Sequence, residues 1–167
     1  MLYILVYMLL LRLTSALEEF GVRYAVAGGH AVALHGAPRG TLDVDLVIPE
    51  TQQDYIRAQK ALASIGLQSR LPVDAKQIFR FRKEYQKNRE LTAWSFMNPE
   101  RPSELVDILL AADLNSLRTE IKRHGKHRIH IIALEDLMEM KKKGGRPQDR
   151  ADLKALREVQ KLRRRKS

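Results

Sequence analysis

The sequence contains no cysteine, which excludes disulfide bonds, thiolate metal sites and a cysteine nucleophile. Any bound metal ion must therefore have oxygen or imidazole ligands. The sequence also lacks internal repeats and any linker rich in proline, glycine or serine. With 167 residues, of which 44% are hydrophobic, the chain is long enough to bury a core, and we expect residues 1–167 to form a single domain.

No apolar run is long enough to cross a membrane. The longest, MLYILVYMLLL at residues 1–11, ends at Arg12 and falls short of the roughly 20 residues that a spanning helix needs. It also lacks the charged start and small-residue cleavage site of a signal peptide. We therefore expect a cytoplasmic protein without a membrane span. Residues 1–8 form an apolar extension before a helix over 9–20; the extension packs on the core, pairs with another subunit or reflects an upstream choice of start codon.

Acidic residues are in the minority. The chain has 30 Lys and Arg against 20 Asp and Glu, a net charge of +10, which suits a polyanionic partner such as RNA, DNA or a nucleotide, or an anionic membrane surface. Basic residues in the middle of the chain alternate with aromatic ones, Phe79, Phe81, Tyr85 and Trp94. These aromatic residues either stack on the bases of single-stranded RNA or belong to the core.

The hydrophobic pattern alternates between strands and helices. It predicts strands at 24–27, 42–48, 78–82, 91–97, 104–110 and 128–133, and helices at 30–35, 51–66 and 113–123. From Leu134 onward it predicts two helices separated at Gly144-Gly145. We therefore expect an α/β (α+β) fold with a mixed sheet flanked by helices and a helical, basic C-terminal part at 134–167.

Asp43 and Asp45 interrupt an otherwise apolar strand, LDVDLVI at 42–48. Two carboxylates at i and i+2 share one face of a strand, where their charges repel unless a cation lies between them. Mg²⁺ is commonly held by one or two carboxylates and leaves its other positions to water and phosphate. A solvated strand end would also tolerate two aspartates, but burying this strand without an ion or hydrogen bonds would be costly.

Gly28-Gly29 lies between a predicted strand and a predicted helix. Such a pair is often only a turn, but here it also exposes backbone N–H groups at the start of a helix, where phosphate binds. The order of Gly28-Gly29, a short helix and then Asp43-x-Asp45 resembles the polymerase-beta-type nucleotidyltransferase superfamily. The resemblance implies that Gly28 and Gly29 hold the triphosphate of an NTP and that the acids bind two Mg²⁺ ions. It also implies a third metal-binding, catalytic acid on a later strand, for which Asp107 in ELVDIL is the candidate; the alternative is an exposed strand-edge aspartate.

A closer resemblance covers two stretches together, GGHAVALHGAPRGTLDVDL at 28–46 and LEDLMEMKKKGGRPQDRADL at 134–153. Both are similar to nucleotidyltransferases related to the abortive-infection (AbiEii-type) toxins. The recurring residues of that pattern correspond to Lys141, Arg146, Asp149 and Asp152. The resemblance implies a catalytic role for Lys141 and nucleotide-binding roles for Arg146 and Asp149. Lys141 and Arg146 would neutralise the triphosphate, and the two aspartates would orient these cations or cap the helix. An exposed helix with solvated ion pairs would have a similar sequence.

Three further residues of the first stretch are candidate nucleotide-binding residues, namely His30, Arg39 and Thr41. His30 stands where many superfamily members have a serine whose hydroxyl contacts phosphate. Arg39 and Thr41 come directly before the two acids, although Thr41 is also a plausible first residue of the strand. We expect His30 to lie near phosphate.

Three functions follow from these patterns. The first is Mg²⁺-dependent transfer of a nucleoside monophosphate from NTP to an acceptor hydroxyl on tRNA, another RNA or a protein, in a toxin-antitoxin system with a cognate partner protein. The second is a catalytically weak nucleotide-binding module of such a pair. The third is a basic RNA-binding domain whose acids are structural. The sequence leaves the nucleotide, the acceptor and the oligomeric state open.

Overall fold

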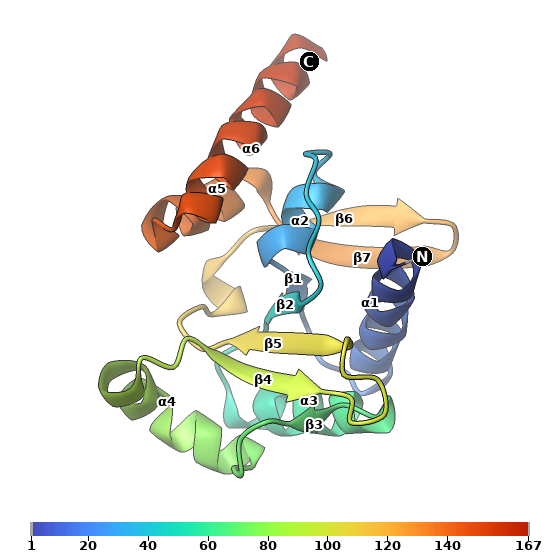
Figure 1. The fold of residues 1–167 in the computed structure, drawn as a ribbon. Helices are drawn as coiled ribbons and strands as arrows, with labels where there is room; N and C mark the ends of the chain where they lie inside the picture. The colour runs from blue at the N-terminus through green and yellow to red at the C-terminus, as the bar shows by residue number, and fades with distance from the viewer. Residues whose placement is uncertain (1, 167) are drawn as a thin grey trace.

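The computed structural model describes residues 2–166, which form a seven-stranded sheet with helices on both faces (Figure 1). The helices are α1 (Leu2–Glu19), α2 (Gly28–Leu34), α3 (Gln52–Ser64), α4 (Ala75–Arg89), α5 (Leu134–Gly144) and α6 (Pro147–Lys166), with a 3₁₀ turn at Leu114–Ser116. The strands are β1 (Ala25–Val26), β2 (Val44–Val47), β3 (Gln68–Ser69), β4 (Ala93–Met97), β5 (Leu105–Leu109), β6 (Thr119–His124) and β7 (His127–Ile132).

The sheet is mixed. Its strand order is β3-β4-β5-β2-β1-β7-β6. β2 runs parallel to β5 and β1 runs parallel to β7, whereas β1 and β2, and both pairs at the sheet edges, are antiparallel. This confirms the predicted fold class and places β2, which carries the predicted acids, in the middle of the sheet.

Alternation along the strands divides the core into two layers. Val44 and Leu46 of β2 pack on the side of α1, α3 and α4, together with the fully buried Trp94. Val47 packs on the opposite side with residues of α2, α5 and α6. Because successive side chains of a strand point to opposite faces, Asp45 shares the α2, α5 and α6 side with Val47. The candidate site therefore lies on the side of the sheet formed by residues 28–46 and 134–153, the two stretches that resemble nucleotidyltransferases.

The N-terminal apolar residues belong to α1 from Leu2 onward, so the predicted boundary between an extension and a helix at residue 9 is wrong. Val6 is already buried, and Leu9, Leu10 and Leu13 join the core, whereas Ile4 stays exposed. An interior apolar face continues through both parts of the helix, which explains why they form one element. None of the helices among residues 2–166 combines the length and the hydropathy needed to cross a bilayer.

The predicted strand at 78–82 is wrong, because these residues lie in the middle of α4. Asp74 accepts a hydrogen bond from the Gln77 backbone N–H, and the Gln77 side chain accepts one from the Asp74 backbone N–H. This reciprocal capping box starts a helix and outweighs a short alternating pattern. Phe79 packs on the core from α4, and Trp94 is fully buried, so neither forms part of an exposed RNA-stacking surface.

The predicted helix at 113–123 is also wrong. A single 3₁₀ turn follows Asp113, and the chain then forms β6, which pairs with β7 as a hairpin. Gly125 in the hairpin turn has φ +56°, a conformation that glycine adopts without strain. The predicted α3 cap is confirmed, since the Thr51 side chain accepts a hydrogen bond from the Asp54 backbone N–H.

Candidate active site

Three carboxylates converge on one face of the sheet. Asp45 of β2 and Asp107 of β5 are paired in register on neighbouring parallel strands. Asp43 precedes Asp45 by two residues and so points to the same face. Each of the three offers a carboxylate oxygen within 4.8 Å of the others. Oxygen ligands at this spacing suit Mg²⁺, so the structure brings together all three predicted metal ligands in an arrangement that fits the ion.

The Asp45 carboxylate lies in an environment that disfavours its charge. Burial is the largest cause, the charges of Asp43 and Asp107 add to it, and together they raise the pKa of Asp45 to about 7. The positive charges of Lys141 and Arg146 lower the pKa but do not cancel the effect. A cation between the carboxylates would reverse this balance, because it favours the ionised form.

The raised pKa makes Asp45 a source of pH-dependent instability in buffer without divalent cations. The folded state keeps a proton that the unfolded state releases between about pH 4 and pH 7, so stability falls as the pH rises through this window. We expect Asp45→Asn to match the wild type at pH 4 and to have a higher Tm at pH 8, by on the order of 5 °C. Thermal unfolding across this range in EDTA measures the difference. Glu84→Gln, on the exposed face of α4, serves as the control; a Tm difference independent of pH would contradict the prediction.

Two cations face the acids from the C-terminal helices. Lys141 of α5 is only 8% exposed, and its Nζ lies 3.2 Å from Asp149 Oδ1 and 2.8 Å from Asp152 Oδ2. Arg146, in the turn before α6, places Nε 2.8 Å from Asp149 Oδ2. Burial raises the pKa of Asp149, but the hydrogen bonds from Arg146 and Lys141 lower it more, so its pKa lies below the ordinary value. Asp149 is therefore ionised and holds both cations in place.

A cavity of about 740 Å³ lies between the acids and the cations. Most of the predicted site residues line it, namely Gly29, Arg39, Thr41, Asp43, Asp45, Asp107, Lys141 and Arg146. Three predicted nucleotide-binding residues are not among its lining residues. Gly28 lies beneath Asp45, Asp149 lies behind the two cations, and His30 lines a neighbouring cavity. Burial lowers the pKa of His30 more than the neighbouring Asp43 raises it, so the ring is neutral at pH 7.

The fold is similar to the folds of solved nucleotidyltransferase structures. No protein-family model and no curated protein matches the sequence. The structure is similar to the solution structure of the antibiotic-resistance factor ANT(2'')-Ia, with TM-score 0.60, 13% identity, and 95% of this chain and 84% of that chain covered. It is also similar to the lincosamide antibiotic adenylyltransferase LnuA, with TM-score 0.59, 15% identity, and 87% and 92% of the two chains covered. A third similar structure is an antigenic nucleotidyltransferase-like protein from Paracoccidioides brasiliensis, with TM-score 0.57, 17% identity, and 96% and 76% covered. The chain has a nucleotidyltransferase fold.

Gly28 and Gly29 have no side chains, and the space beside them is occupied by the side chains of Asp45 and Thr41. A Cβ on Gly28 would lie 1.7 Å from Asp45 Oδ2, and the residue has φ +57°. A Cβ on Gly29 would lie 2.8 Å from the Thr41 side chain. The space beside Gly28 is thus filled by a candidate metal ligand, and the expected binding of phosphate by the backbone N–H groups of this turn stays a prediction. Ala27, before α2, makes no side-chain cap, so the N-cap side chain does not occupy the N–H groups at the start of the helix.

Asp152 and Gln148 are part of the site in a way that sequence reasoning only partly anticipated. Asp152 Oδ1 lies 3.0 Å from Arg39 Nε and accepts a hydrogen bond of 2.9 Å from Gln148 Nε2, while Oδ2 pairs with Lys141. Asp152 thereby joins the segment before β2 to α5 and α6. In the sequence, the only local indication of this role is that Asp152 follows Asp149 by three residues and so shares its helix face. Glu104, the other acid near β5, instead pairs with Arg12 and accepts a hydrogen bond from Asn98.

Replacing Asp152 by asparagine should destabilise the protein by about 2 kcal/mol, because a buried charge with several polar partners is lost. In this variant Lys141 still forms its ion pair with Asp149, whereas Arg39 no longer has a carboxylate partner at residue 152. Urea unfolding measures the difference. Glu158→Gln is the control, since Glu158 and Lys161 form an ion pair with both side chains 64% exposed, and solvent screens such a pair so that its loss should have little effect on stability. Equal, small effects of both substitutions would show that the Asp152 contacts do not stabilise the fold.

Proposed function

We propose that this protein transfers a nucleoside monophosphate from an NTP to a hydroxyl group of an acceptor. The observation that carries the proposal is the cavity bounded by three converging carboxylates on one side and by Lys141 and Arg146 on the other. A divalent cation would relieve the repulsion among carboxylates that share a site in this way, and the facing cations suit a polyphosphate. The nucleotidyltransferase fold agrees with this chemistry.

Asp43, Asp45 and Asp107 would hold two Mg²⁺ ions, which, when bound, supply neutralising charge for the triphosphate and lower the pKa of the attacking hydroxyl. Lys141 and Arg146 would bind phosphate oxygens, with Asp149 fixing both side chains. Asp107 would accept the proton of the acceptor hydroxyl at a carboxylate oxygen. The acceptor oxygen forms a bond to the α-phosphorus, the bond from that phosphorus to the bridging oxygen breaks, and pyrophosphate leaves.

The charge near the cavity favours an anionic acceptor, and we propose tRNA or another RNA. Arg146 lines the cavity, and Lys142, Lys143 and Arg150 are exposed on the same turn and its flanks. The net charge of +10 acts in the same direction. An aminoglycoside such as the tobramycin of one similar structure is a polycation, and these side chains would repel it. A toxin role with a cognate partner protein rests on the resemblance to AbiEii-type nucleotidyltransferases.

The proposal is tested by incubating the protein with Mg²⁺ and each of four labelled NTPs in separate reactions. The acceptors are tRNA, total RNA, the protein itself, tobramycin and lincomycin. We expect label in RNA, dependent on Mg²⁺ and accompanied by pyrophosphate. Label in an antibiotic would replace the RNA acceptor with a small molecule. NTP binding without transfer to any acceptor would favour the catalytically weak module, and RNA binding without NTP binding would favour the basic RNA-binding domain.

A further inference from the structure

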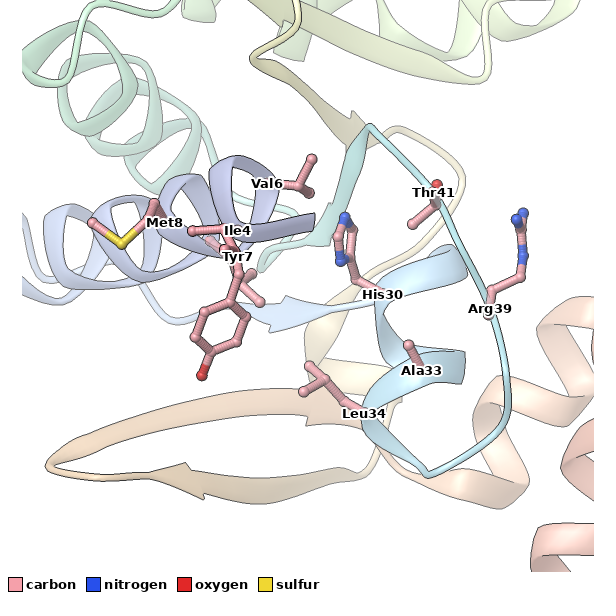
Figure 2. A pocket seen from close by; sticks show the side chains of 10 residues that line it. Ile4, Val6, Tyr7, Met8, His30, Ala33, Leu34, Arg39 and Thr41 are labelled. Carbon is pink, nitrogen blue, oxygen red and sulfur yellow. The ribbon is translucent and has the colours of Figure 1, made fainter. Parts of the chain in front are cut away.

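A second cavity, of about 440 Å³, lies between the first turns of α1 and helix α2. Its walls are mainly apolar, with Val6 and Leu10 contributed by α1 and Ala33 and Leu34 by α2. Figure 2 shows Leu34 and His30 directed toward α1, with the segment that carries Arg39 and Thr41 running along the other side. The volume and the mainly apolar lining lie within the range of small-molecule and cofactor sites.

His30 supplies a polar ring to the lining of this cavity. Its Nε2 atom is buried and has no hydrogen-bond partner among residues 2–166. Buried polar atoms are nearly always hydrogen-bonded, and leaving one unpaired is costly. The Leu42 backbone lies near the ring, but no hydrogen bond of good geometry from the described part of the chain reaches Nε2, which leaves this atom open to a polar atom of a ligand.

The second cavity adjoins the candidate active site. Arg39 and Thr41 line both cavities, and they come immediately before the acids on the chain. Among the residues that the structure describes, those that line the second cavity include no acid, whereas Arg39 brings a positive charge to the boundary. A ligand that spans both cavities therefore has an anionic part beside Lys141 and Arg146 and an uncharged, flat part beside His30.

We propose that the cavity between α1 and α2 binds the base of the donor nucleotide, with His30 Nε2 hydrogen-bonded to the polar edge of the base and the apolar side chains packed on its faces. This inference rests on the proposed function, since the phosphates of the same nucleotide occupy the first cavity. Asp107 lies on the far side of Asp45 from α2, which leaves that end of the first cavity to the acceptor.

The test compares binding of ATP, GTP, CTP, UTP and inorganic tripolyphosphate in the presence of Mg²⁺. In the wild type, the preferred NTP should bind more tightly than tripolyphosphate, which has no base. Ala33→Leu fills the second cavity and should weaken binding of that NTP by about 10- to 100-fold, or roughly 1.4 to 2.8 kcal/mol, while binding of tripolyphosphate is unchanged. Ala63→Leu, the same change at an exposed position of α3, should alter neither. His30→Phe keeps an aromatic ring but removes the nitrogen, and should reduce discrimination among the four bases.

The outcomes separate the two proposals. If both Ala33→Leu and His30→Phe bind every NTP as the wild type does, the base lies elsewhere and the inference is overturned, while the proposed function stands. An increase in KM for the acceptor alone would also overturn it and assign the cavity to the acceptor. If the wild type binds neither NTP nor tripolyphosphate with Mg²⁺, the proposed function itself fails. Circular dichroism establishes that each variant is folded, and His30→Phe provides the test if Ala33→Leu is not.

Discussion

Asp45→Asn should lower the rate of nucleotidyl transfer by about 1,000-fold or more, because metal ions supply several kcal/mol of charge stabilisation and each 1.36 kcal/mol is tenfold in rate. Asp45 lies between the other two acids, in register with Asp107 and two residues from Asp43. Asparagine keeps the shape of the side chain but removes the charge. The measurement is kcat with the preferred NTP and acceptor at saturating Mg²⁺.

The matched control is Asp54→Asn at the start of α3, on the opposite side of the sheet. It should retain wild-type activity. Asp45→Asn should remain folded and, at pH 8 without divalent cations, should be more stable than the wild type, so loss of activity cannot be attributed to unfolding. Activity of Asp45→Asn within a few-fold of the wild type would show that the acidic cluster is not the reaction centre.

The acids of the site were predictable because their signal is local. Asp43, Asp45 and Asp107 each interrupt an apolar strand, and alternation fixes the face to which a strand residue points. Their convergence was not predictable from alternation alone. It depends on the parallel pairing of β2 with β5, strands that are about sixty residues apart in the sequence. Only the resemblance to polymerase-beta-type nucleotidyltransferases pointed to that pairing.

The two incorrect elements also show the limits of local patterns. A strand at 78–82 was predicted from a five-residue alternation, whereas the capping box at Asp74 lies outside that window. β6 is mostly exposed, and its strand conformation is fixed by pairing with β7 and by the turn at Gly125. Longer-range contacts of this kind also placed His30 in the second cavity and Asp152 beside Arg39.

Gly28→Ala should lower the transfer rate by about 100-fold, the order expected when a reacting group is displaced by about 1 Å. A Cβ at this position would lie 1.7 Å from Asp45 Oδ2 and 2.6 Å from its Cγ, so the carboxylate or the start of α2 must move. The positive φ adds about 1–2 kcal/mol of backbone strain. We therefore expect both a lower Tm and weaker stabilisation by Mg²⁺.

Gly21→Ala is the control that separates the effect of backbone strain from the effect of displacing the Asp45 carboxylate. Gly21 has φ +67°, close to the +57° of Gly28, but a Cβ there would meet no atom within 4 Å. Gly21→Ala should therefore have a lower Tm than the wild type, with unchanged kcat and an unchanged Mg²⁺-dependent shift in Tm. If Gly28→Ala also keeps the wild-type kcat and Mg²⁺-dependent shift in Tm, the displaced Asp45 carboxylate can still bind Mg²⁺. If only Gly28→Ala loses activity, the glycine is required because the metal-binding carboxylate occupies the space where a side chain would be.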